Sequence, residues 1–217
     1  MVADPFEPLG RLRLVPVVEI EDPGAAAELG DALVRAGLPC AEITFRTDGA
    51  AAAIASIRQH CPDVLVGAGT VLTVDQADAA VAAGAAFLVA PGFNPRVVER
   101  ALARGVPIIP GVSTPTEIEA ALAIGLTTLK FFPAEISGGT AFLRAVSGVY
   151  RAVRFVPTGG IGPDNLGSYL ALPNVLACGG SWMVKRDLIN ARRFGAIEEA
   201  VRDAVALAAQ APAGARA

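Results

Sequence analysis

The chain has 217 residues, a net charge of −3 and no basic stripe, so it is long enough for one domain with a full core and is not expected to bind nucleic acid. Its hydrophobic residues (53%, with only 6% aromatic) occur in short runs broken by Gly, Pro or charge, none of which could span a membrane. Cys40, Cys61 and Cys178 are scattered, which indicates neither a disulfide framework nor a zinc site and favours a reducing, cytoplasmic setting.

A repeating unit organises the chain: an Ala-rich, helix-like stretch ends in Gly, and a short β-branched run follows. Such a glycine can take the left-handed conformation that ends a helix, and it does so at Gly37, Gly84, Gly105 and Gly125 in this interpretation. Before the first unit, Met1–Gly10 lacks the basic region and apolar stretch of a signal peptide. The pattern predicts eight strands, at Leu14–Glu19, Cys40–Phe45, Val64–Ala68, Phe87–Ala90, Val106–Pro110, Leu126–Phe131, Arg154–Thr158 and Val175–Cys178.

Helices are expected between these strands, with N-caps at Thr73, Asn94 and Thr114 and a last helix from about Phe194 to Ala209. Strict alternation of strands and helices favours a parallel sheet with helices outside. Eight units favour closure into a single-domain α/β structure over residues 1–217, a (β/α)₈ or TIM barrel. An open doubly wound sheet is the alternative, although no G-x-G-x-x-G follows the first strand.

The second strand carries unusual polar residues. Side chains alternate across a strand, so Glu42, Thr44 and Arg46 share one face, and we expect that face to point inward. Burying a carboxylate and a guanidinium is costly without a partner or a task. On this strand alone, an internal ion pair and a functional site both remain open.

The sixth strand places a single lysine, Lys130, in an apolar run just before a loop. A surface lysine at a strand end is the common alternative. Lys130 shares a face with Thr128 and Phe132, and nearby aromatic rings would help to desolvate the amine and favour its neutral, nucleophilic form. A lysine facing Glu42 inside the sheet would place an imine-forming amine beside a proton shuttle.

Glycine pairs follow the last two strands, in Thr158-Gly159-Gly160-Ile161-Gly162 and Cys178-Gly179-Gly180-Ser181-Trp182. Glycines let backbone N–H groups approach an anion closely, and phosphate sites recur after strands seven and eight of parallel barrels. The two loops, with the hydroxyl of Ser181, therefore predict a phosphate site. Thr70 and Pro91, after the third and fourth strands, are further inward candidates, although both residue types also occur as ordinary turn residues.

Five segments in order resemble the 2-keto-3-deoxy-6-phosphogluconate (KDPG) aldolase family, which includes 4-hydroxy-2-oxoglutarate (KHG) aldolases. The resemblance runs from about Val15 to Ala209, with one departure, Phe45, where Leu is more usual. Residues before it and the Ala-rich tail carry no inference. The segments are Glu42-Ile43-Thr44-Phe45-Arg46-Thr47, Val66-Gly67-Ala68-Gly69-Thr70-Val71, Lys130-Phe131-Phe132-Pro133-Ala134-Glu135, Pro157-Thr158-Gly159-Gly160-Ile161 and Gly179-Gly180-Ser181-Trp182.

The resemblance implies a class I aldolase that cleaves 2-dehydro-3-deoxy-6-phosphogluconate to pyruvate and D-glyceraldehyde 3-phosphate, with no metal and no cofactor. By position it implies Lys130 as the Schiff-base lysine and Glu42 as the general acid and base. It also implies a homotrimer and a place in the Entner–Doudoroff pathway. The substrate-binding residues it implies are Arg46 and Thr70 for the carboxylate, Pro91 and Phe132 for the pyruvyl wall, and Thr158, Gly159, Gly160, Gly180 and Ser181 around the phosphate.

Other functions remain as alternatives. A KHG aldolase or an aldolase for the galactonate epimer would use the same residues. A phosphosugar isomerase or epimerase would use Glu42 as base without an imine, and a phosphometabolite-binding protein would use only the phosphate loops. The only histidine, His60, is expected on the surface at a helix end, which argues against histidine-based chemistry.

Overall fold

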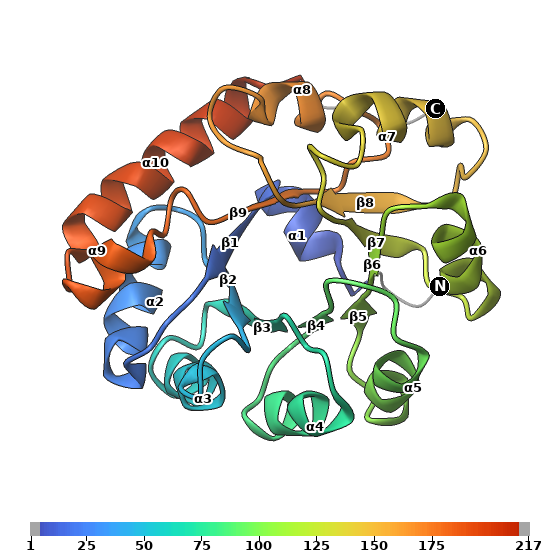
Figure 1. Cartoon of the computed structure of the whole chain (residues 1–217). Helices are drawn as coiled ribbons and strands as arrows, with labels where there is room; N and C mark the ends of the chain where they lie inside the picture. The colour runs from blue at the N-terminus through green and yellow to red at the C-terminus, as the bar shows by residue number, and fades with distance from the viewer. Residues whose placement is uncertain (1–4, 213–217) are drawn as a thin grey trace.

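The computed structural model describes residues 5–212 as an α/β fold. Short parallel strands curve around a common centre, and helices cover their outer side (Figure 1). The strands are β1 (Leu14–Val18), β2 (Cys40–Thr44), β3 (Leu65–Gly69), β4 (Leu88–Val89), β5 (Ile108–Ile109), β6 (Gly111–Val112), β7 (Thr128–Phe131), β8 (Arg154–Pro157) and β9 (Cys178–Gly180).

Helices alternate with the strands, as the repeating unit predicts. One 3₁₀ turn, η1 (Pro23–Ala25), precedes the second helix. The helices are α1 (Glu7–Leu12), α2 (Ala26–Arg35), α3 (Ala50–His60), α4 (Val74–Ala82), α5 (Pro95–Ala103), α6 (Pro115–Ala123), α7 (Gly139–Ser147), α8 (Leu166–Leu170), α9 (Arg186–Asn190) and α10 (Phe194–Gln210).

The strands pair in parallel in two sheets, one in the order β5-β4-β3-β2-β1-β9 and one in the order β6-β7-β8. Of the predicted fifth strand, Val106–Pro110, only β5 is regular, and β6 follows in a segment predicted as a loop; Pro110, which has no N–H to donate, lies between the two. Isolated bridges join Phe155 to Val175 and Thr158 to Gly179 across the gap between β8 and β9. The prediction of a parallel sheet with helices outside is confirmed.

The helix ends follow the sequence signals. Thr73 and Thr114 each cap a helix in a capping box, with Gln76 and Glu117 bonding back to the cap, and Asn94 accepts a hydrogen bond from the N–H of Arg96. The four predicted terminating glycines all have positive φ: Gly37 at 80°, Gly84 at 89°, Gly105 at 69° and Gly125 at 81°.

The last strand differs from its prediction. The chain forms a turn in which the Val175 N–H bonds to the Leu172 carbonyl, so regular pairing starts only at Cys178. Gly179 and Gly180 therefore belong to β9 and do not form a loop after it. A Cβ on Gly180 would overlap the Trp182 ring, which is why only glycine lets the strand run beneath that side chain.

Two apolar clusters hold the fold together. The larger one fills the space between the sheet and the outer helices, where Ile43 and Leu129 point. The smaller one lies on the inner side of the strands, where Phe6 and Leu9 of the α1 region pack with Phe87 and Leu176 near the strands' amino ends. Helix α1, visible through the centre of the strands in Figure 1, was not predicted from the sequence. Within residues 5–212 no helix is both long and apolar enough to cross a membrane.

Candidate active site

A buried amine and a buried carboxylate meet on the inner side of the sheet. Lys130 lies in β7 and Glu42 in β2, and the Lys130 Nζ is 3.1 Å from the Glu42 Oε1. Their side chains are only 6% and 2% exposed. Two residues 88 positions apart in the chain thus form one hydrogen-bonded pair inside the fold.

Alternation along each strand explains this meeting. On β2, Ile43 joins the cluster under the helices, so its neighbours Glu42 and Thr44 turn to the inner side. On β7, Leu129 and Phe131 take the helix side, which turns Lys130 inward. The Thr44 hydroxyl donates a hydrogen bond to the Val18 carbonyl at 2.8 Å and links β2 to β1.

Space for the carboxylate comes from a glycine on the next strand. A Cβ on Gly69 of β3 would lie 2.2 Å from the Glu42 Oε1 and 2.5 Å from its Cγ, far below any normal contact. Lys130, the other member of the pair, lies over the Phe132 ring, with its Nζ 5.5 Å from the ring centroid. The amine therefore contacts a carboxylate and also lies near the face of an aromatic ring.

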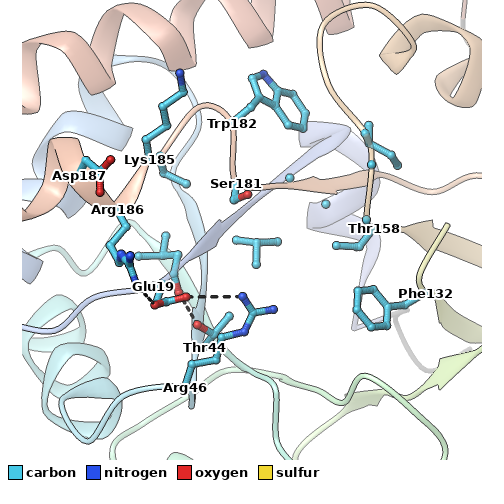
Figure 2. Close-up of a pocket in the computed structure, with 18 residues that line it drawn as sticks. Glu19, Thr44, Arg46, Phe132, Thr158, Ser181, Trp182, Lys185, Arg186 and Asp187 are labelled. Carbon is cyan, nitrogen blue, oxygen red and sulfur yellow. Dashed lines mark hydrogen bonds and ion pairs between the residues drawn. The ribbon is translucent and has the colours of Figure 1, made fainter. Parts of the chain in front are cut away.

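A pocket of about 650 Å³ opens at the carboxyl ends of the strands (Figure 2). Lys130 and Glu42 are not themselves among the lining residues, but Phe132, whose ring is near the Lys130 amine, is part of the pocket wall, so the buried pair lies behind that wall. Neither Thr70 nor Pro91 is among the lining residues, and Thr70, directly after β3, has a left-handed φ of 55°. Seven of the predicted site residues line the pocket: Arg46, Phe132, Thr158, Gly159, Gly160, Gly180 and Ser181.

The loop after β8 is tightly built. Gly159 and Gly160 have φ values of 100° and 79°, and a Cβ on Gly160 would lie 2.6 Å from the Cγ of Glu135. Glu135 in turn accepts a short hydrogen bond from the Tyr169 hydroxyl. Burial, and next the hydrogen bond to Glu135, raise the pKa of Tyr169. The Glu135 N–H also donates a hydrogen bond to the Gly159 carbonyl at 3.1 Å, so the backbone of the Gly-Gly turn is held in place at the pocket wall.

One polar atom at the pocket has no partner. The Oγ1 of Thr158 is buried and makes no hydrogen bond within the described part of the chain. It lies 2.3 Å from where a Cβ on Gly179 would be, so the glycine on β9 makes room for this hydroxyl. An unpartnered hydroxyl in a pocket wall is suited to a polar ligand.

A further charged group, Glu19, was not predicted from the sequence but lies at the same pocket. Glu19, just after β1, lies 2.9 Å from Arg186 at the start of α9 and 3.6 Å from Arg46 after β2 (Figure 2). The hydrogen bond to Glu19 is the main reason that the pKa of Arg186 is raised. Glu19 ends a predicted strand, but no local signal links it to Arg186, which is 167 residues away.

The three cysteines and the histidine add no further reactive group to the Lys130–Glu42 pair. Burial raises the pKa of Cys40 and Cys178, and burial with a hydrogen bond to Asp31 raises that of Cys61 to about 11, so all three stay protonated at neutral pH. His60 is exposed at the end of α3, as predicted, with its Nδ1 2.9 Å from the Ser56 carbonyl. Residues 5–212 hold no cluster of three or more side chains suited to a metal.

A buried lysine next to a carboxylate, inside a parallel α/β fold, has the groups that class I aldolases need: an amine able to form an imine and a carboxylate able to carry protons. These enzymes are carbon–carbon lyases. Comparison of the sequence with known protein families agrees with that class. The family model for KDPG and KHG aldolase matches residues 7–200, which includes α1. The chain belongs to this aldolase family.

Individual relatives cover nearly the whole chain. The 2-dehydro-3-deoxy-phosphogluconate aldolase of Treponema pallidum is 58% identical over 88% of this chain and 91% of its own. The KDPG aldolase of Legionella pneumophila, solved with pyruvate captured as a covalent carbinolamine, has a TM-score of 0.86 at 37% identity, covering 93% and 98% of the two chains. The Zymomonas mobilis enzyme, solved with 3-phosphoglycerate, has the same TM-score at 36% identity and 98% coverage of each chain.

Proposed function

We propose that this aldolase cleaves 2-dehydro-3-deoxy-6-phosphogluconate to pyruvate and D-glyceraldehyde 3-phosphate, with Lys130 as nucleophile and Glu42 as proton carrier. The observation that carries the proposal is the buried 3.1 Å contact between the two side chains beside a glycine-lined pocket. The covalent pyruvate adduct in the Legionella relative supports the same chemistry.

The first step is imine formation. Transfer of a proton from Lys130 to Glu42 leaves a neutral amine, and the uncharged pair is the form that burial penalises least. The amine adds to the C2 ketone of the substrate, giving a carbinolamine. Loss of water, with a proton supplied by Glu42, then gives a protonated imine.

The imine cation is the electron sink for the cleavage. Glu42, directly or through one water, takes the proton of the C4 hydroxyl while the C3–C4 bond breaks, and the aldehyde leaves. The remaining enamine takes that proton back at C3, and water hydrolyses the imine to release pyruvate. A single carboxylate serves both steps because it is a base in the first and an acid in the second.

The substrate's two anionic ends have separate partners in this proposal. Arg46 and Thr70 bind the keto-acid carboxylate, and Pro91 and Phe132 form the wall around the pyruvyl group. The phosphate binds at the glycines of the pocket, Gly159, Gly160 and Gly180, and at the hydroxyls of Thr158 and Ser181. The positive φ of the two loop glycines and the unpartnered Thr158 hydroxyl support this assignment.

Trapping tests the proposal. Incubation with pyruvate and borohydride should leave a reduced pyruvyl adduct on Lys130, located by peptide mass spectrometry. An isomerase, an epimerase or a binding protein would leave none. An active enzyme with unmodified Lys130 would refute the assignment.

A second candidate substrate is 4-hydroxy-2-oxoglutarate, because the family's own description covers it. The glycine-lined phosphate site favours the phosphorylated sugar acid. Measuring kcat/KM for the gluconate-series phosphate, its galactonate epimer and 4-hydroxy-2-oxoglutarate, with pyruvate release coupled to lactate dehydrogenase, ranks the three. A preference for the unphosphorylated substrate would overturn the phosphate assignment.

We also propose that the chain, predicted as one domain over residues 1–217, forms a single (β/α)₈ barrel by closure of the two sheets, and that it is a cytoplasmic homotrimer; residues 1–4 and 213–217 of the predicted domain lie outside the described residues. The bridges from β8 toward β9 and the lone Pro110 between β5 and β6 support closure. Three free cysteines support a reducing compartment. Trimerisation rests on the family resemblance, and sedimentation equilibrium tests it: a monomer mass would refute it.

A further inference from the structure

Three charged side chains lie in a row in the wall of the pocket, and family resemblance assigns a role to only one of them. Glu19 lies between Arg46 on one side and Arg186 on the other (Figure 2). All three line the pocket. They come from three separate elements: the ends of β1 and β2 and the start of α9.

The two contacts of Glu19 differ in strength. Its Oε1 accepts a hydrogen bond from the Arg186 Nη1 at 2.9 Å, the length of a charge-assisted bond. Its Oε2 is 3.6 Å from the Arg46 Nη1, which is an ion pair too long for such a bond. Glu19 is therefore bound to Arg186 and only loosely attracts Arg46.

This difference in strength matters because two anions can pair with Arg46: the Glu19 carboxylate and, in the proposed function, the carboxylate of the substrate. Its side chain is 51% exposed, so it has room to move toward either one. Within residues 5–212, Arg46 and Arg186 are the cations that pair with Glu19. If Arg186 were absent, Glu19 would be free to hydrogen-bond Arg46, and a substrate carboxylate would have to displace it.

We propose that Arg186 is a positioning residue, which holds Glu19 and so keeps the Arg46 guanidinium available for the carboxylate of the keto acid. The inference rests on the proposed function, in which Arg46 binds that carboxylate. Arg186 is also 3.9 Å from Glu21, but that contact is too long for a hydrogen bond. Glu21 does not line the pocket, so Glu19 is the carboxylate through which Arg186 acts on Arg46.

Pyruvate is the probe, because it has the keto-acid end of the substrate without the phosphate. The measured quantity is the pyruvate concentration that gives half-maximal borohydride trapping on Lys130. Arg186→Gln should raise it about fivefold, equivalent to about 1 kcal/mol, while the maximal extent of trapping stays the same. Arg192→Gln is the matched control: it removes the same charge just after α9 and breaks ion pairs to Asp22 and Glu28, and it should leave the value unchanged.

A double variant separates positioning from a direct effect of the Arg186 charge. In Arg186→Gln/Glu19→Gln the competing carboxylate is gone, so the half-saturating concentration should return to within about twofold of that of Glu19→Gln alone. A value that stays raised in the double variant, or an unchanged value in Arg186→Gln, overturns the inference. Absence of any adduct in the wild-type protein would instead overturn the proposed function.

Discussion

At the scale of single residues, the proposed role of Glu42 as proton carrier can be tested directly by substitution. Glu42→Gln keeps the size and a hydrogen-bonding group next to Lys130 but cannot take up a proton. We expect turnover to fall by about 10²- to 10⁴-fold, the usual contribution of a positioned acid–base group, while the borohydride-trapped adduct still forms but more slowly, because water must then take the proton of Lys130 and supply the proton for dehydration. Steady-state kinetics and mass spectrometry measure the two effects. Glu99→Gln, on the surface of α5, is the control, and near-normal turnover in Glu42→Gln would remove Glu42 from the mechanism.

The buried hydroxyl of Thr158 makes a second residue-scale prediction. Thr158→Val removes an atom that has no hydrogen-bond partner, so the free energy of unfolding should not fall, since an unsatisfied buried group costs about 1–3 kcal/mol. KM for the phosphorylated substrate should rise several-fold, because a binding group is lost. Thr44→Val, whose hydroxyl does bond the Val18 carbonyl, should instead lose about 1 kcal/mol of stability. Equal destabilisation of the two variants in urea titrations would contradict this account.

The sequence alone predicted some of these residues as part of the site and not others. Lys130 and Glu42 stand out because each interrupts an apolar strand, and alternation fixes the side on which each lies. Glu19 and Arg186 carry no such signal: each is an ordinary charge at the end of an element. Their pairing depends on where α9 begins relative to β1, and that is a property of the tertiary structure.

At the scale of elements, the sequence predicted an element's start where the signal lies within a few residues of it. It did not do so where the start depends on pairing with a strand distant in the sequence. The capping boxes at Thr73 and Thr114 involve partners three residues away, and both form as predicted. The start of β9 depends on a turn at Leu172–Val175 and on strand β1, whose Leu14 pairs with Cys178. The sequence pattern placed the start of this strand three residues too early, because the pattern does not show which residues of β1 the strand pairs with.

Strand β3 makes the element-scale prediction, because its glycine provides the space for a side chain of β2. Gly69→Ala would place a Cβ 2.2 Å from the Glu42 Oε1, within a sheet that cannot move apart easily. The Glu42 side chain must leave its present position beside Lys130, so we expect kcat to fall by at least tenfold and stability to fall by about 1–3 kcal/mol. Gly195→Ala, in α10 with nothing within 4 Å of the new atom, is the control and should leave kcat unchanged. Wild-type kcat in Gly69→Ala would show that the pair does not need this space.

At the scale of the whole molecule, the two ends of the strands have separate tasks. The pocket lies at the carboxyl ends, and the cluster around α1 lies toward the amino ends. Arg13, which ends α1 with a left-handed φ of 62°, donates hydrogen bonds to the carbonyls of Ala208 and Ala211 and so ties the start of the chain to the end of α10. Residues near the start of the chain therefore stabilise the fold, a role that their sequence did not indicate.

This division predicts that stability and activity can be changed independently. Leu9 is 1% exposed and packs in the inner cluster with Phe87 and Leu176, away from the pocket. Leu9→Ala should lower the free energy of unfolding by about 2–5 kcal/mol, because the side chain lost from a packed cluster leaves a cavity. Because α1 contributes no residue to the pocket lining, kcat and KM at 25 °C should stay within about twofold of wild type. Urea denaturation and steady-state assays on one preparation measure both quantities, with Leu102→Ala on the exposed side of α5 as the control for each. A Leu9→Ala protein that kept its stability, or one that lost turnover while still fully folded, would show that the two ends are not independent.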